Sequence, residues 1–288
     1  MRGHSSLFVV IILLLTNCDY IPKEDKHPEV PFFEDIIQDK SIFQPVLKRD
    51  PAVYDSHQLF FLNNGKYISV KETLEEVPGN DEDGVKQDTK HLNVYNVLIE
   101  DLNNRPFLTR VVKTDKYSPI IVDKDANLYL DGNFYGSPDY KLLKKLKLIN
   151  ITDSLAARTQ KETSTNLDSL NQVQLSILER KYHFKQKNDE DYIIQNDQLI
   201  LFRNTDVIVD ALHQQKGFDE FDDSILMEYR NDNRAFPNSY YYYYYNIGKI
   251  KFKYFDGKSG TINPTKIEYG GQAYLYHPKF GIYRIIKK

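Results

Sequence analysis

After the first fifty residues, short runs of apolar and aromatic side chains recur along the chain, separated by turn-forming residues. This spacing favours strands, because amphipathic helices need longer periodic stretches. Runs at 58–61 and 67–70 flank Asn64-Gly65, and these two residue types tolerate the positive φ angles of tight hairpin turns. The sequence therefore predicts a hairpin there and a second strand pair at 91–100 and 107–113.

The C-terminal half shows the same pattern of short apolar runs separated by turn-forming residues. Asn-Asp, Asp-Gly and Gly-Gly pairs punctuate its apolar runs and serve as turn signals. The strands predicted from these runs are 192–202 (with a turn at Asn196-Asp197), 207–209, 240–245, 250–255, 261–269, 273–276 and 282–286.

Two stretches depart from the β pattern. Ser137-Pro138-Asp139 precedes apolar Leu142, Leu143 and Leu146, which predicts a helix over 140–148 with Ser at its N-cap and Pro in its first turn. Residues 152–172 are rich in Ser, Thr, Asn and Gln with little apolar periodicity. We expect a loop or a weak helix there, and the internal boundary of the chain.

The pattern as a whole predicts a mainly β fold of antiparallel hairpins and meanders, with repeated β units and one or two short helices. The expected organisation is a signal peptide at 1–17, a lipidated tether at 18–50, an N-terminal β-rich region at 51–150, a polar linker or weak helix at 151–175, and a C-terminal β-rich region at 176–288.

The N-terminus carries an export signal. Arg2 precedes nine uncharged apolar residues, Leu7 to Leu15. As a helix this run would span about 13 Å, less than half of a hydrocarbon core of about 30 Å. It is therefore typical of a signal peptide rather than of a transmembrane anchor.

The residues that follow, Leu15-Thr16-Asn17-Cys18, resemble the lipobox of bacterial lipoproteins, although Asn17 stands where Gly, Ala or Ser is usual. The resemblance implies cleavage before Cys18 and lipid on its thiol, and several acyl chains would give lasting membrane attachment. The alternative is an ordinary signal peptide with an incidental cysteine. The expected location is the cell envelope, on the periplasmic or the exposed face of a membrane.

The amino-acid composition limits how the fold can be stabilised and which charged partners the chain attracts. Cys18 is the only cysteine, so the mature chain can form no internal disulfide and must be held by its core. Without Arg2, 37 basic side chains stand against 41 acidic ones, a net charge of −4. This weak acidity gives no overall field for nucleic acid or anionic lipid.

Two stretches, 121–136 and 192–209, can be laid over one another as strand, turn, strand, turn and short strand. Such units need neighbours to bury their apolar faces. In the first, Asp123-Lys124-Asp125-Ala126-Asn127 and the strand that follows resemble the DKNYY repeat family of bacterial proteins, with 121–146 matching one unit. The resemblance implies a short helix at 140–143 and no catalytic residues, since the activity of that family is unknown.

No motif for catalysis or metal binding is complete. Asp123, Asp125, Asn127 and Asp131 follow the spacing of a calcium loop, but Leu128 and Phe134 stand where Gly and Glu are required. A polar β-turn is the better interpretation. The run 257–260 lacks the first glycine of a phosphate-binding loop and also predicts a turn.

The histidines form no metal-binding pair, and His277 is expected at the surface or in the core rather than as a general base. There is no nucleophile turn of the Gly-x-Ser-x-Gly type. Paired carboxylates among the 41 acidic residues leave a glycosidase-like hydrolase open. No cofactor and no metal site are predicted.

A run of six tyrosines, Tyr240, Tyr241, Tyr242, Tyr243, Tyr244 and Tyr245, is the most unusual feature of the sequence. In a strand, three rings would point to each face. One face would fill a core, and the other would either present rings to a sugar or peptide or rest on neighbouring loops.

These observations favour a non-enzymatic, membrane-anchored module that binds a protein or a glycan and no nucleic acid. The alternatives are an envelope hydrolase and a structural or immunity lipoprotein.

Overall fold

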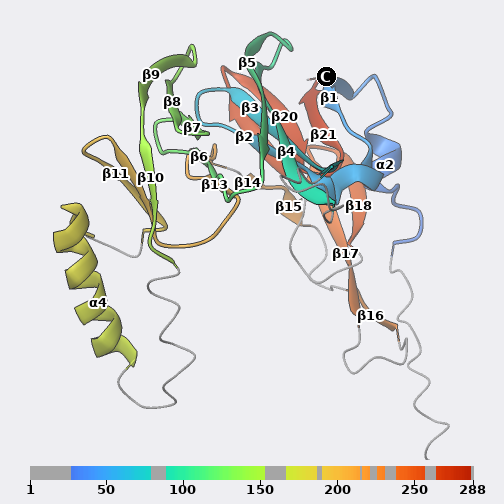
Figure 1. Ribbon diagram of the computed structural model, residues 1–288. Helices are drawn as coiled ribbons and strands as arrows, with labels where there is room; N and C mark the ends of the chain where they lie inside the picture. Colours follow the sequence, from blue (N-terminus) through green and yellow to red (C-terminus); the bar gives the residue numbers. More distant parts are fainter. Residues whose placement is uncertain are drawn as a thin grey trace, which may run out of the picture. The chain divides into compact units, whose positions relative to one another are not determined.

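The computed structural model describes residues 27–78, 89–152, 167–186, 190–214, 216–220, 226–230, 238–256 and 264–286. Strands dominate these ranges, most strand pairs are antiparallel and two α-helices are present, which confirms the predicted mainly β fold. The chain divides into two compact units, with boundaries after Arg49 and after Gln214; Figure 1 labels the helices and strands. Unit 1 combines residues 1–49 with 215–288, and unit 2 is the continuous segment 50–214.

The described residues of unit 1 form two sheets in which the strand pairs are antiparallel. The order of the five-stranded sheet is β1-β21-β20-β19-β14, with bounds β1 (Phe43–Lys48), β14 (Lys216–Gly217), β19 (Thr265–Tyr269), β20 (Gln272–His277) and β21 (Gly281–Ile285). The other sheet is centred on β17, and its members are β15 (Asp219–Glu220), β16 (Leu226–Arg230), β17 (Asn238–Ile247) and β18 (Ile250–Asp256).

The segment 27–49 belongs to unit 1, although the sequence predicts that 18–50 is a tether. It forms the short helix α2 (Phe33–Ile36) and strand β1, which pairs with β21. Phe33, Ile36 and Ile37 are buried in the apolar cluster of the unit. Their burial stabilises this N-terminal arm against the body. Cys18 and the rest of the predicted tether precede the described residues.

Three sheets, a 3-10 helix and an α-helix are formed by the residues of unit 2 that the structure describes. The sheet orders are β2-β3-β4-β5, β13-β6-β7-β8-β9 and β10-β12-β11. The bounds are η1 (Pro51–Ser56), β2 (His57–Phe61), β3 (Lys66–Val77), β4 (Lys90–Asp101), β5 (Pro106–Thr114), β6 (Ile120–Val122), β7 (Leu128–Leu130), β8 (Asn133–Gly136), β9 (Lys141–Lys145), β10 (Lys147–Asn150), α4 (Leu167–Tyr182), β11 (Tyr192–Gln195), β12 (Gln198–Leu201) and β13 (Val207–Val209).

The first two predicted hairpins are confirmed. β2 and β3 are joined through Asn64-Gly65, where Gly65 has φ +74° and the Asn64 side chain accepts a hydrogen bond from the Lys66 amide. β4 and β5 turn at Asn104, which also adopts a positive φ. Both turns are encoded locally by residue types that accept this backbone geometry.

The predicted helix at 140–148 is wrong, because β9 and β10 occupy this range. Tyr140 adopts φ +54°, which breaks a right-handed helix at its first turn. The backbone beyond it pairs with β8, and the Leu146 amide donates to the Gly132 carbonyl at 2.8 Å. The hydrogen bonds of the strand ladder therefore prevail over a helical apolar spacing that covers only the five residues from Leu142 to Leu146.

The two stretches with similar patterns have the same order of elements but different pairing. In the first, β6, β7 and β8 form a continuous antiparallel meander. In the second, β11 and β12 form a hairpin through Asn196-Asp197, whereas β13 pairs with β6 in parallel. β10 and β12 are the other parallel pair. The two stretches share the buried cluster Ile121, Tyr129, Phe134, Leu146, Leu199, Leu201 and Ile208.

Helix α4 overlaps the polar segment that was expected to be a loop or weak helix, and it extends to Tyr182. Leu178 anchors the end of the helix in a small apolar cluster with Ile149, Ile151 and Ile200. The C-terminal part of α4 therefore packs against residues of β10 and β12.

Candidate functional site

A cleft in unit 2 begins where two parallel strands end. β6 and β13 are in register, with Val122 opposite Val209, so the next residue of each strand is an aspartate, Asp123 and Asp210. The Asp210 amide donates to the Val122 carbonyl at 2.8 Å, which extends the pairing to this point. Neighbouring strands lie about 4.8 Å apart, so the two carboxylates start from adjacent backbone positions.

The loop after β6 is held by its own aspartate. The Asp123 carboxylate accepts hydrogen bonds from the backbone amides of Asp125 and Asn127 at 3.0 and 2.8 Å and from the Asn127 side-chain amide at 3.0 Å. Ala126 lies in the left-handed region at φ +61° and is fully buried. The loop is thus the polar β-turn that the sequence predicted, and Asp125 projects from it as an exposed side chain.

The β2–β3 hairpin supports the same loop from another direction. The Asn63 side chain donates to the Lys124 carbonyl at 2.8 Å, while its backbone amide donates to the Ala211 carbonyl at 2.8 Å. One asparagine therefore ties the loop after β6 to the segment after β13, and this fixes the two sides of the cleft relative to each other.

The third side of the cleft is β11 and the residues before it. The Tyr192 hydroxyl donates to the Asp210 carboxylate at 2.8 Å. Burial, that hydrogen bond and nearby carboxylates raise the pKa of Tyr192, so the phenol keeps its proton and remains a donor. Asp191 pairs with Arg203 at 3.1 Å.

Together these segments enclose about 490 Å³. Five carboxylates line the cleft against one lysine, and two isoleucines of β11 add an apolar wall. The full lining is Asp123, Lys124, Asp125, Glu190, Asp191, Tyr192, Ile193, Ile194 and Asp210. Within the described residues, Asp125 and Glu190 are the two lining carboxylates whose oxygens have no hydrogen-bond or ion-pair partner.

This volume lies in the range of small-ligand sites, which combine an apolar wall with a few placed polar groups. Its charge suits a cationic head group, and the isoleucine wall suits the aliphatic stem that carries such a group in Lys, Arg or an alkylamine. In the part of the chain that the structure describes, no three His, Cys, Asp or Glu side chains are grouped to hold a metal ion.

The six-tyrosine run lies in β17 of unit 1. The described rings are those of Tyr243, Tyr244 and Tyr245, while the side chains of Tyr240, Tyr241 and Tyr242 lie outside the described residues. Tyr244 and Tyr245 are 1% and 3% exposed. The Tyr245 ring packs on Phe252 and Phe218, with ring centroids 5.3 and 6.2 Å away. Both faces of the strand are therefore covered at this end, and these two rings do not form an exposed row.

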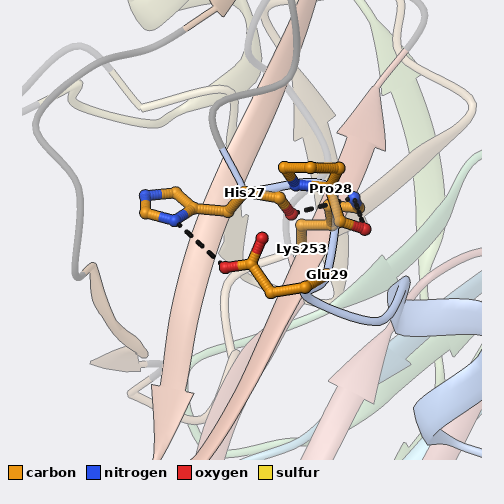
Figure 2. A network of polar contacts seen from close by, with 4 residues as sticks. All are labelled: His27, Pro28, Glu29 and Lys253. Atoms are coloured by element: carbon orange, nitrogen blue, oxygen red, sulfur yellow. Dashed lines mark hydrogen bonds and ion pairs between the residues drawn. The ribbon is translucent and has the colours of Figure 1, made fainter.

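The covering residue on the other face is His27 of the N-terminal arm, whose ring lies edge-on to Tyr244 with centroids 5.0 Å apart. Figure 2 shows the polar contacts that hold this part of the arm. The buried Lys253 amine donates to the carbonyls of His27 and Pro28 at 3.2 and 3.3 Å. His27 also lies 3.6 Å from the Glu29 carboxylate.

Among the other positions singled out in the sequence, the structure describes His277. His277 is fully buried, packs among the rings of Phe33, Tyr254 and Phe280, and accepts a hydrogen bond from the Lys279 amide at 3.0 Å, so it is a core histidine. The run 257–260 lies outside the described residues, as does Cys18.

No family model, no curated protein and no solved structure matches the chain. None of the helices in the described ranges has the length and apolarity needed to cross a bilayer.

The sequence suggests Asp123 and Asp125 only as members of an incomplete calcium loop, for which a polar β-turn is the better interpretation, and it gives no indication that Glu190, Asp191 and Asp210 line a site with them. The only local signal was the acidic residue after the apolar run 207–209. Its significance depends on the parallel pairing with β6, which joins segments 87 residues apart by the register Val122 to Val209.

Proposed function

We propose that the protein is a membrane-anchored binding module of the cell envelope, without a catalytic step of its own, and that the cleft of unit 2 receives a positively charged group of its partner. The leader before Cys18 and the lipobox-like residues support the anchor. The observation that carries the binding proposal is the cleft, where five carboxylates and an apolar wall surround about 490 Å³.

The expected affinity for a small cation is modest. Each partly exposed contact between a cation and a carboxylate contributes about 0.5 to 1 kcal/mol, so several such contacts correspond to dissociation constants of about 0.2 mM to tens of millimolar. A partner that presents several basic groups would bind more tightly through multivalency.

Titration calorimetry of residues 19–288 with N-acetylarginine amide and with spermidine tests this proposal. We expect both to bind and N-acetylglutamate not to bind. Asp125→Asn/Glu190→Gln should weaken binding roughly tenfold, because it removes two carboxylates that are not needed by the fold. Glu76→Gln/Asp206→Asn removes two carboxylates outside the cleft lining and should leave binding unchanged. Equal weakening by both pairs would contradict a role for the cleft.

The anchor has a separate test. Metabolic labelling with a palmitate analogue should mark the wild-type protein and not the Cys18→Ala variant. A mature protein that begins elsewhere and carries no fatty acid would refute the anchor and leave the cleft proposal standing.

A hydrolase is the second candidate, because Asp123 and Asp210 extend from adjacent parallel strands and paired carboxylates about 5 to 10 Å apart can cleave glycosidic bonds. Against it, the Asp123 carboxylate is occupied with three contacts inside its own loop, and Asp210 accepts from Tyr192. Turnover of a panel of 4-nitrophenyl glycosides that disappears in both Asp123→Asn and Asp210→Asn would favour this candidate.

A further inference from the structure

Strand β9 lies at the edge of the β13-β6-β7-β8-β9 sheet (Figure 1), and its side chains form an unusual surface. All five of its residues, Lys-Leu-Leu-Lys-Lys, are exposed. Leu142 and Leu143 are 53% and 62% exposed, among the largest exposed apolar side chains of the described residues. Lys147 follows at the start of β10 and is also exposed. Exposed leucines beside lysines therefore form a patch, which we call the β9 patch (Lys141–Lys147).

The β9 patch has an excess of positive charge, although the whole chain is weakly acidic. Lys141 lies 3.7 Å from Asp139, and Lys144 lies 2.9 Å from Asp197. In the described ranges, the amines of Lys145 and Lys147 are not engaged in an ion pair. Two positive charges therefore remain next to the leucine pair.

The fold holds the leucines outward. β8 and β9 shift register so that Tyr135 is opposite Leu142 and Phe134 is opposite Lys144, which leaves Leu143 as the extra residue of a bulge. A Cβ atom on Gly136 would lie 2.7 Å from the Leu143 side chain. Leu143 thus rests over the bare backbone of Gly136 while most of its surface faces solvent.

We propose that the β9 patch is a contact site for the surface of a bilayer that carries anionic phosphate headgroups. Lysines near such a surface are attracted to it, and exposed leucines gain by entering the interface between headgroups and acyl chains. This inference goes beyond the proposed function, because it concerns the protein surface itself and requires neither lipid on Cys18 nor a ligand in the cleft.

Charge complementarity favours a bilayer over a second copy of the chain. Edge strands can pair with one another, and lysines on an edge are a common defence against this. If two β9 strands paired antiparallel about Leu143, Lys141 of each would face Lys145 of the other, and like charges directly opposite one another are unfavourable. The same lysines are favourable against anionic headgroups. Protection of the edge strand against pairing explains the lysines, but it does not explain why two adjacent leucines are exposed.

Vesicle co-sedimentation of residues 19–288, which include every described residue, tests the proposal without the lipid anchor. We expect binding to vesicles of phosphatidylcholine with 30% phosphatidylglycerol, no binding to pure phosphatidylcholine, and loss of binding in 0.5 M NaCl. Lys145→Gln/Lys147→Gln should reduce the partition constant roughly thirtyfold. Lys71→Gln/Lys116→Gln, two exposed lysines elsewhere in unit 2, is the matched control and should reduce it much less.

Leu142→Ser/Leu143→Ser separates a bilayer site from a simple polyanion site. It should weaken vesicle binding at least tenfold while leaving binding to soluble polyphosphate unchanged. The proposal is overturned if the lysine variant and its control bind vesicles equally, or if the leucine variant binds as well as the wild type. It is also overturned if the protein ignores vesicles and forms a dimer that Leu142→Ser/Leu143→Ser dissolves in sedimentation equilibrium.

Discussion

Units 1 and 2 are both built from sheets, but their interiors differ in chemistry. In the main apolar cluster of unit 1, seven of the eleven described buried residues are aromatic. In the largest cluster of unit 2, three of sixteen are aromatic and the rest are aliphatic residues or alanine. The described Tyr and Phe residues of this cluster thus stabilise the core of unit 1, whereas the cleft lies in unit 2, whose largest cluster is mainly aliphatic.

The difference between the two interiors follows from the way in which the side chains of each unit pack together. In unit 1, rings from β17, β18 and the arm interlock at centroid separations of about 5 to 6 Å, which depends on close backbone fit. In unit 2, short aliphatic strands pack together and end in polar loops, and two such loop starts are brought side by side by the parallel pair β6–β13. We expect substitutions to be costly in the first arrangement and tolerated at the cleft of the second.

The largest effect on the free energy of unfolding is expected for a substitution at Gly281 of unit 1. It adopts φ +110°, and a Cβ atom there would lie within 2 Å of the Leu47 carbonyl oxygen across the β1–β21 pair. Gly281→Ala should lower the free energy of unfolding by about 4 kcal/mol, because the contact is with backbone and φ is unfavourable for alanine. Gly270→Ala, at φ +58° with nothing within 4 Å, should cost about 1 kcal/mol. Urea unfolding followed by near-ultraviolet circular dichroism would measure both, and equal costs would contradict the close fit.

The next largest effect concerns the arm. Phe33 is fully buried among four aromatic rings, so Phe33→Ala should cost about 3 kcal/mol and expose the arm to trypsin at Lys40. Its neighbour Phe32 is 37% exposed and touches Lys253 through its ring face. Phe32→Ala should therefore cost about 1 kcal/mol and leave Lys40 protected. Cleavage at Lys40 in both variants, or in neither, would show that ring burial does not hold the arm.

Alkaline pH should affect both units through buried phenols. Burial raises the pKa of Tyr140 in unit 2 and of Tyr283 in unit 1 to about 12. Between pH 10 and 12 the unfolded chain loses these protons first, so stability falls as pH rises, by about 2 kcal/mol for each tyrosine. Tyr140→Phe and Tyr283→Phe should each flatten the dependence of the urea midpoint on pH in this window. Tyr269→Phe, at an exposed ring, is the control, and an equal flattening in all three variants would reject this assignment.

The smallest effect is expected in the cleft. Asp125→Asn should change the free energy of unfolding by less than about 0.5 kcal/mol, since the side chain is exposed and supports no other residue of the described loop. Asp123→Ala in the same loop should cost about 1 to 2 kcal/mol, because three hydrogen bonds disappear. Thermal unfolding of the pair measures the difference, and a costly Asp125→Asn would mean that this carboxylate serves the fold.

The features that sequence alone predicts are those decided within a few residues. Asn64-Gly65 and Asn104 determine their turns directly, so the hairpins of unit 2 follow from local chemistry. The stretch 140–148 shows the limit, because its leucines have a helical spacing and only the partner strand β8 decides otherwise. The cleft cannot be predicted from the sequence for the same reason. Asp123 and Asp210 become neighbours through a parallel strand pairing, and no periodic pattern in the sequence indicates that pairing.

The docking of the arm on unit 1 also limits how far this unit could lie from lipid on Cys18. From Cys18 to His27, where the described arm begins, there are nine residue steps, and even a fully extended chain covers at most about 32 Å in that number. With lipid on Cys18, the point where the Lys253 amine binds the carbonyls of the arm could lie no farther from the bilayer than roughly the thickness of the hydrocarbon core. That separation would then be shorter than an ordinary globular domain, so such a domain would not fit between the bilayer and this point of unit 1.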